Sequence, residues 1–329
     1  MNVAVVGAGV MGLATARELA KRGHEVNVHE QFDLLHTRGS SHGTSRIFRL
    51  SYPEEEWIRL AQRGYALWRE VEKESGTRLL ELHGLVDVDI DPTERLRAFA
   101  ACGVDYEELS PADVRQRFGF AYDEIPRLVF TADAGISLAD EAVRTLADAA
   151  RKHGARIHER SRVERLEDVD ADVVVVTAGG WAPVLLGAAG IELAARPTRE
   201  TIAYYGLRED GVFPSLIDEL HEHQYFALAA PGVGVKAGLH HSGAPTDPDR
   251  DEGPDAEIVS AVSAWVARRL PRVDPSPLHA ESCIYTSTAD LRFVCERRGR
   301  IVVGSACSGH GFKFAPAVGE QLADLAEAS

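Results

Sequence analysis

The N-terminal segment carries a pattern of apolar and polar positions that predicts a βαβ unit. Residues 2–6 form a short apolar run rich in valine, which is typical of a buried strand. Residues 11–22 place apolar side chains at helical spacing, and Gly23 ends the predicted helix. Apolar and polar residues alternate over 24–30, which predicts a second strand.

The remaining pattern mixes helical and extended segments. Helical spacing predicts helices at residues 57–75, 111–118, 140–153, 256–270 and 314–328. Apolar alternation or continuous apolar runs predict strands at residues 85–90, 156–158, 163–166, 173–177, 201–207, 225–228, 232–238 and 301–304. The run at 173–177 is β-branched throughout and indicates a parallel strand buried on both faces. Pro, Gly and Asp dominate residues 242–254, which predicts an exposed loop there.

Length and charge narrow the class of protein. The chain has 329 residues, which is long enough for two domains, and its 45% hydrophobic content is ordinary for a globular protein. The formal net charge of −15 argues against nucleic acid and anionic membrane surfaces as partners, because both bind basic surfaces. The cysteines form no C-x-x-C pair, so we expect no metal site. We find no signal-peptide pattern and no apolar run of about 18 residues, so a cytoplasmic location is expected.

A glycine motif stands between the first predicted strand and helix. Gly7, Gly9 and Gly12 form G-x-G-x-x-G, in which the glycines permit a tight turn, close approach of a pyrophosphate, and tight helix–strand packing. Glu30 ends the second predicted strand, where a carboxylate can accept hydrogen bonds from a ribose diol. The motif predicts a dinucleotide site without separating NAD from FAD. The alternative is a glycine-rich turn in an unrelated α/β protein.

A second turn favours the larger cofactor. T-A-G-G-W, with Gly179 and Trp181, follows the buried valine run and places another backbone turn beside the first. This arrangement suits an extended cofactor such as FAD, although an ordinary turn at a strand end is the simpler reading of the segment alone. No arginine directly follows Glu30, which argues against NADP.

Candidate cations follow a segment of small residues. Residues 40–43 read S-S-H-G, and Arg46 and Arg49 come next. Small residues let a loop lie close to a ligand. The two arginines project to one side in a helix and diverge in an extended chain, and taken alone they are most simply surface arginines in ion pairs.

Four segments together resemble the monomeric sarcosine oxidase group of the D-amino-acid-oxidase-like flavoenzymes. They are H-T-R-G-S-S-H-G-T-S-R-I-F-R, V-K-A-G-L-H, C-I-Y-T-S-T and S-G-H-G-F-K-F, in the order of that group. The resemblance spans residue 1 to about residue 325. It implies an α/β fold in which a Rossmann-like FAD-binding domain (1–85, 129–190 and 275–329) is interrupted by an antiparallel-sheet substrate domain (86–128 and 191–274).

The resemblance also implies roles for residues of a substrate cavity. Arg49 and Lys313 would bind the substrate carboxylate, which agrees with the preference of a guanidinium for bidentate contacts. Lys236 would activate oxygen above the flavin. His240 and His310 would line the cavity. Two further pocket positions are expected at Tyr225 and at Leu216, where the group can carry methionine.

Other positions are implied to hold the cofactor. His42 and Arg46 would assist flavin attachment, and Cys283 would form a covalent bond to the FAD, whereas an unattached buried thiol is the alternative. The remaining expected FAD contacts are Ser41, Val163, Gly179, Trp181, Gly309, Gly311 and Lys313.

The function implied is oxidation of an amino acid that bears a secondary amine: sarcosine, another N-methyl amino acid or a cyclic imino acid. Hydride passes to the flavin, an imine forms, and O2 is reduced to H2O2. The protein is expected to be a monomer whose partners are the amino acid and O2. The alternatives are a dehydrogenase or biosynthetic tailoring oxidase of the same fold, a flavin-binding protein without turnover, and an NAD dehydrogenase.

Overall fold

A parallel sheet forms the first half of the fold. A computed structural model describes residues 1–209 and 211–328. Its six-stranded sheet has the order β17-β18-β10-β1-β2-β9. The strands are β1 (Asn2–Val6), β2 (Glu25–His29), β9 (Arg156–His158), β10 (Val173–Val176), β17 (Val294–Arg298) and β18 (Ile301–Ser305). Only β17 runs antiparallel to its neighbour. The predicted α/β class and the buried valine strand are confirmed.

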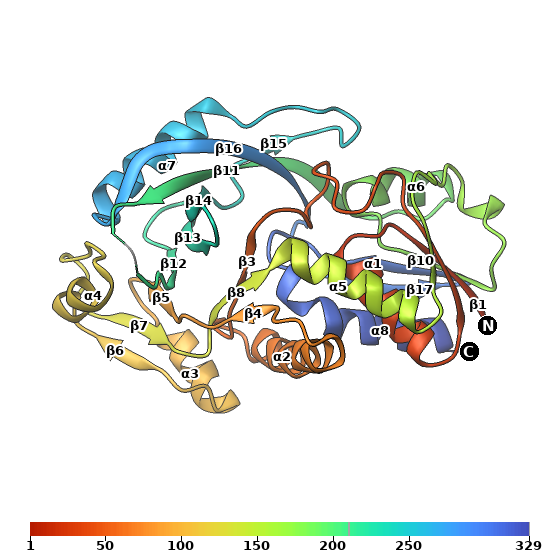
Figure 1. Ribbon diagram of the computed structural model, residues 1–329, viewed down its shortest axis with the longest axis horizontal. Helices are drawn as coiled ribbons and strands as arrows, with labels where there is room; N and C mark the ends of the chain where they lie inside the picture. The colour runs from red at the N-terminus through yellow and green to blue at the C-terminus, as the bar shows by residue number, and fades with distance from the viewer. Residues whose placement is uncertain (210, 329) are drawn as a thin grey trace.

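Helices cover both faces of this sheet. One face packs on α1 (Val10–Lys21), α5 (Ala139–Lys152) and α8 (Ala315–Glu327), with α2 (Glu55–Ser75) outside them. The other face packs on the short helix α6 (Ala182–Ala188). Both faces of β10 are therefore apolar, which explains its uninterrupted valines. Both chain ends lie on this side of the molecule (Figure 1).

A larger, mostly antiparallel sheet forms the second half. Its order is β15-β11-β14-β13-β12-β5-β7-β6, and β16 pairs with β11. The strands are β5 (Leu85–Val88), β6 (Glu107–Leu109), β7 (Leu128–Thr131), β11 (Ala195–Leu207), β12 (Ser215–Asp218), β13 (Tyr225–Ala230), β14 (Gly234–Leu239), β15 (Ala244–Pro245) and β16 (Val273–Thr288). The helices α4 (Pro111–Phe118) and α7 (Ala256–Arg269) pack on this sheet, whereas α3 (Thr93–Cys102) packs against α2.

A small sheet joins the two halves. It consists of β3 (Ser45–Phe48), β8 (Gly135–Leu138) and β4 (Leu80–Glu81). The long pair β11 and β16 also runs from the region of α7 to the side of α6 (Figure 1). Although the sequence assigned residues 275–329 to the FAD-binding domain, β16 pairs with β11 of the larger sheet. The domain limits themselves stay a prediction.

Several elements of the fold were misread or missed in the sequence. Residues 163–165 are not a strand, and 166–168 form a 3-10 turn, because only Leu166 is buried there, against the α6 side of the sheet. Ten further elements were not predicted: the strands β3, β4, β6, β7, β8, β12, β15 and β17 and the helices α3 and α6. The strand β16 was missed because most of its N-terminal half is exposed, so no apolar alternation marks it. Among the residues described, no helix combines the length and apolar character needed to cross a membrane.

Candidate active site

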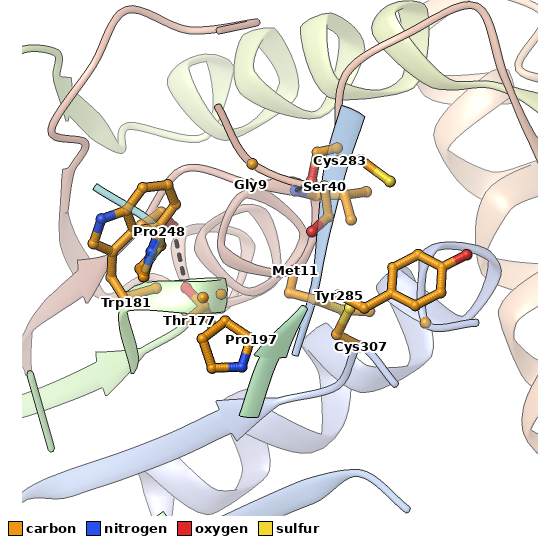
Figure 2. A pocket seen from close by; sticks show the side chains of 18 of the residues that line it. Gly9, Met11, Ser40, Thr177, Trp181, Pro197, Pro248, Cys283, Tyr285 and Cys307 are labelled. Carbon is orange, nitrogen blue, oxygen red and sulfur yellow. Dashed lines mark hydrogen bonds between the residues drawn. The ribbon is translucent and has the colours of Figure 1, made fainter. Parts of the chain in front are cut away.

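One cavity of about 780 Å³ connects the two sheets. It extends from the glycine-rich turn after β1 to the strands β12, β13 and β14. Figure 2 shows part of its lining, with Trp181, Pro248 and Thr177 gathered at one end. Cys283 and Tyr285 of β16 lie toward the other end (Figure 2). The cavity is therefore long, and each end is built by different elements.

The nucleotide end is shaped by backbone turns. Gly7 has φ +101°, and a Cβ there would lie 2.7 Å from the carbonyl oxygen of Thr177. A Cβ on Gly12 would lie 1.9 Å from the carbonyl oxygen of Gly7. Larger residues at either position would push α1 away from the strands. Gly12 therefore allows α1 to pack closely against the turn at Gly7, and it is not itself part of the cavity lining.

Glu30 is held in place at the end of β2. One carboxylate oxygen accepts from the N–H of Ala8 at 2.8 Å and the other from the N–H of Phe32 at 3.0 Å. The side chain is buried and lines the cavity. Each oxygen keeps a free lone pair, so the carboxylate is positioned to accept a diol. The contact of Glu30 with a ribose stays a prediction.

Part of the segment 242–254 closes this end of the cavity. Asp249 accepts from Nε1 of Trp181 at 2.7 Å and pairs with Arg162 at 3.1 Å. Arg38 donates to the backbone oxygen of Asp249 at 2.8 Å. The segment is largely exposed, as predicted, but residues 246–249 also line the cavity.

Two cations, buried Lys236 and partly buried Arg46, line the cavity close to each other. Lys236 on β14 donates to the carbonyl oxygen of Ser45 at 2.9 Å, and Arg46 donates to the same oxygen at 2.9 Å. Burial, together with the charge of Arg46, holds the pKa of Lys236 well below its usual value. Burial and both cations lower the pKa of His42 to about 3, and its Nε2 has no hydrogen-bond partner in the part of the chain described. These donors suit a group that carries or develops negative charge.

Cys283 lies beside the same cations. Burial raises the pKa of its thiol to about 11, while Arg46 and Lys236 act in the opposite direction. The thiol lines the cavity and is 3% exposed. Attack by this sulfur therefore requires a base or a cofactor that lowers the cost of losing the proton.

Arg49 and Lys313 form a second pair of cations. The Nη1 of Arg49 donates to the carbonyl oxygen of Ser51 at 2.8 Å, and its buried Nε has no partner among residues 1–209 and 211–328. Lys313 donates to the Tyr52 hydroxyl at 2.9 Å and to the carbonyl oxygen of His310 at 2.7 Å. Burial and the charge of Arg49 hold the pKa of Lys313 well below its usual value. Two buried cations that share a cavity and have no carboxylate bound between them favour an anionic ligand.

Two neutral histidines flank this pair. Burial and the charge of Lys313 lower the pKa of His310 to about 3. Burial and His241 likewise hold the pKa of His240 well below its usual value. The His240 Nδ1 lies 3.1 Å from the hydroxyl of Tyr285. Imidazoles in this state can hold a substrate amine without adding charge.

Most of the predicted site residues line this one cavity. Those that do are Gly7, Gly9, Glu30, Ser41, His42, Arg46, Arg49, Val163, Gly179, Trp181, Lys236, His240, Cys283, Gly309, His310, Gly311 and Lys313. The three exceptions are Gly12, Leu216 and Tyr225.

The position of Tyr225 corrects the sequence interpretation. Its ring stacks on Trp265 at 5.1 Å in the core on the other side of the sheet. Leu216 also lies in that core. Side chains alternate along a strand, so their neighbours Phe226 and Ile217 line the cavity instead. The prediction was one position out of phase on both strands.

The cavity also contains side chains that the sequence did not indicate. They are Gln224, Phe226, Tyr285 and Cys307. Tyr52 contacts both cations of the second pair: Arg49 lies over its ring, and Lys313 donates to its hydroxyl. Tyr285 had a usable signal, because it stands two residues after Cys283 on the same strand. In the region described, no group of three or more His, Cys, Asp or Glu side chains is arranged to hold a metal ion.

The residues present fit an FAD. The glycine cradle and Glu30 suit its nucleotide, and His42, whose Nε2 has no partner among the described residues, lines the cavity close to Arg46 and Lys236. The cavity extends from the turn after β1 to the region of Cys283, and this length suits an extended cofactor better than a mononucleotide.

Known proteins agree with this arrangement. Residues 2–325 match the family described as FAD dependent oxidoreductase. Human peroxisomal sarcosine oxidase is 33% identical, over 98% of this chain and 90% of that protein. Monomeric sarcosine oxidase of Bacillus sp. (strain B-0618) is 29% identical, over 99% of this chain and 92% of that protein. A solved structure of a variant of NikD, titled an unusual amino acid oxidase essential for nikkomycin biosynthesis, superposes with a TM-score of 0.89 at 28% identity and covers 99% and 93% of the two chains.

The match spans nearly the whole chain, and it includes the glycine-rich turn, Glu30 and the cavity between the sheets. The chain is therefore a member of the FAD dependent oxidoreductase family.

Proposed function

We propose that the protein is an FAD-dependent oxidase of an amino acid that bears a secondary amine: sarcosine, another N-methyl amino acid or a cyclic imino acid. The observation that carries the proposal is the pair of buried cations, Arg49 and Lys313, in the cavity that also holds the dinucleotide turn. A simple amine would leave both cations without a counter-ion. An amino acid supplies the carboxylate that they lack.

The residues around this pair would bind and orient the substrate. The Nε of Arg49 and the ammonium of Lys313 receive the carboxylate. His240 and His310 are neutral, and the nearby cations disfavour a protonated substrate amine. The substrate is therefore held with a neutral nitrogen, which can share its lone pair as hydride leaves the adjacent carbon.

The FAD supplies the redox chemistry, accepting hydride from the carbon beside nitrogen and passing two electrons to O2 to give H2O2. Lys236 and Arg46 would stabilise negative charge that develops as oxygen is reduced. The imine product hydrolyses after release. We also propose that Cys283 would be joined to a methyl group of the FAD: a C–S bond would replace the S–H bond and one C–H bond, and the two electrons and two protons released would pass to the flavin and then to O2. Arg46 and Lys236 would favour the thiolate that this bond requires.

The relatives support this choice of substrate class. Sarcosine oxidases of bacterial, plant and animal origin are among the proteins similar to this chain. The similarity to NikD supports a second candidate, a biosynthetic tailoring oxidase that acts on a different amine, and a dehydrogenase of the same fold is a further alternative. The relative named monomeric supports a monomer, whereas the peroxisomal relative leaves the cytoplasmic location a prediction.

The test is a substrate panel with purified protein. Sarcosine, other N-methyl amino acids, L-proline, a six-membered cyclic imino acid and the amines without carboxylates are mixed with the enzyme without oxygen, and loss of the yellow colour is followed. Hydrogen peroxide is then measured in air. We expect only the amino acids to react and peroxide to form. Bleaching without peroxide favours a dehydrogenase.

Substitutions locate the reaction in this cavity. Arg49→Ala and Lys313→Ala should each raise the KM for the amino acid, with Arg144→Ala as a control because Arg144 is exposed on α5. Full turnover by both cavity variants would contradict the proposed carboxylate site.

A further inference from the structure

A line of buried polar contacts leaves the anion site and returns to the cavity elsewhere. It begins at the carbonyl oxygen of Ser51, which accepts from Nη1 of Arg49 at 2.8 Å. The hydroxyl of Ser51 donates to Oδ2 of Asp87 on β5 at 2.7 Å. Asp87 is 1% exposed and pairs through Oδ1 with Nη1 of Arg95 at 2.8 Å. The guanidinium of Arg95, on α3, is thus linked to Arg49 through Asp87 and Ser51.

The second branch starts at the same guanidinium. Arg95 donates through Nη2 to the carboxylate of Glu219, just after β12. Glu219 in turn accepts from the side-chain amide of Gln224 at 2.5 Å. The backbone carbonyl oxygen of Gln224 accepts a hydrogen bond from the backbone N–H of His240 at 2.8 Å. Both Gln224 and His240 line the cavity, so this branch ends at a second part of the cavity lining.

We propose that Arg95, which does not itself line the cavity, is a positioning residue that holds Arg49 for the substrate carboxylate and Gln224 for the rest of the substrate. This inference rests on the proposed function. Arg95 is 4% exposed, and its guanidinium contacts three carboxylates: Asp87 on β5, Asp89 just after β5 and Glu219 just after β12. Lysine offers one ammonium and cannot reproduce this set of contacts.

Charge explains why the arrangement needs Arg95. Burial raises the pKa of Asp87, and Arg95 and then Arg49 oppose that rise. Without Arg95, Asp87 would be left with Arg49 as its nearest cation. The cost of a buried unpaired carboxylate would then draw the guanidinium of Arg49 toward Asp87 and away from the cavity. Arg95 therefore leaves Arg49 free to bind an anion.

The test uses the yellow holoenzyme, acetate as the carboxylate ligand and the best amino acid from the substrate panel. For Arg95→Met we expect acetate to bind about tenfold more weakly, as is common when a supporting contact is lost. KM should rise with the Kd, while kcat at saturation changes less than about threefold, because the carboxylate contact is made before and during the reaction. The matched control is Arg97→Met. Arg97 lies on the same helix, pairs only with exposed Glu94, and should leave both constants unchanged.

Non-additivity shows whether Arg95 acts through Asp87. The double variant Asp87→Asn/Arg95→Met should weaken acetate binding no more than the larger single effect, because both substitutions break one line of contacts. If Arg95→Met does not fold, Glu219→Gln tests the second branch at a half-buried position. It should raise the KM of the amino acid while acetate, which does not reach Gln224, binds as before.

The outcomes separate the inference from the proposed function. If the unsubstituted enzyme binds no carboxylate, the proposed function fails. If it binds acetate and Arg95→Met binds acetate equally well, or if the two substitutions add fully, the positioning role is refuted. A loss of thermal stability without a change in Kd would likewise show that Arg95 serves only the fold.

Discussion

Replacing Lys313 by methionine distinguishes two effects of this buried charge: its contribution to anion binding and its cost to the stability of the fold. The ammonium is 1% exposed and donates only to neutral acceptors, the Tyr52 hydroxyl and the carbonyl oxygen of His310. Burial and Arg49 hold its pKa well below the usual value. Methionine is unbranched and fills a similar space without charge. Lys313→Met should therefore weaken anion binding while relieving a cost to the cofactor-free fold.

The two effects differ in size. Losing a hydrogen bond to a charged group costs about 1.5–3 kcal/mol, or roughly 10- to 150-fold in the Kd of a carboxylate. Replacing buried charge by apolar atoms stabilises by up to about 4 kcal/mol, but two acceptors then lose a donor at about 1 kcal/mol each. The net change in the free energy of unfolding at pH 7 is thus expected within about 2 kcal/mol of zero. The pH dependence of that change is more diagnostic than its size.

The sign follows from proton binding. Lys313 has a lower pKa in the folded chain than in the unfolded chain, so the unfolded state binds more protons between the two values. Lys313 therefore makes the free energy of unfolding of the unsubstituted protein increase as pH rises toward about 10.4, the usual lysine pKa. The variant lacks that gain. Its advantage over the unsubstituted protein should shrink with rising pH.

The assay is urea unfolding of the cofactor-free protein at pH 7 and pH 9.5, for the unsubstituted chain and for Lys313→Met. Lys152→Met is the control, because Lys152 is exposed at the end of α5. Lys236 contributes to both proteins and cancels in the difference. A difference that does not change with pH would refute the argument from burial, and unchanged acetate binding by the holo variant would refute the role in the anion site.

Three other outcomes are expected. Acid precipitation should leave the yellow colour in the pellet, and Cys283→Ser should release it to the supernatant; release from the unsubstituted protein would exclude the covalent bond. In the Cys283→Ser background, Asp249→Ala removes the bond from Trp181 and should weaken FAD binding by about 1–2 kcal/mol in a flavin fluorescence titration, unlike Asp251→Ala at an exposed site. Acetate affinity should fall as pH rises above neutrality, because the lowered pKa of Lys313 brings loss of its charge closer to pH 7; an equal fall in Lys313→Met would assign the effect to another group.

Local sequence was sufficient for the central part of the cofactor half, the unit β1-α1-β2 and the strand β10. The valine run of β10 and the glycine turn before α1 are specified by neighbours in the chain: the period of apolar residues and the absence of a Cβ where one would collide. The individual cations of the site were also recognisable, because each stands in a short motif of unusual composition. Those motifs alone did not show that Arg49 and Lys313 lie against the same tyrosine ring.

Tertiary structure decided what depends on contacts distant in sequence. The phase of β13 is set by packing of Tyr225 on Trp265, which turns Phe226 toward the cavity, and a short alternating strand does not itself say which face is covered. The link from Arg95 to Arg49 likewise exists only because α3, β5 and the segment after β3 meet in space. The spacing of apolar side chains is determined by the local sequence, whereas the partner of a buried charge depends on how the sheets and helices pack together.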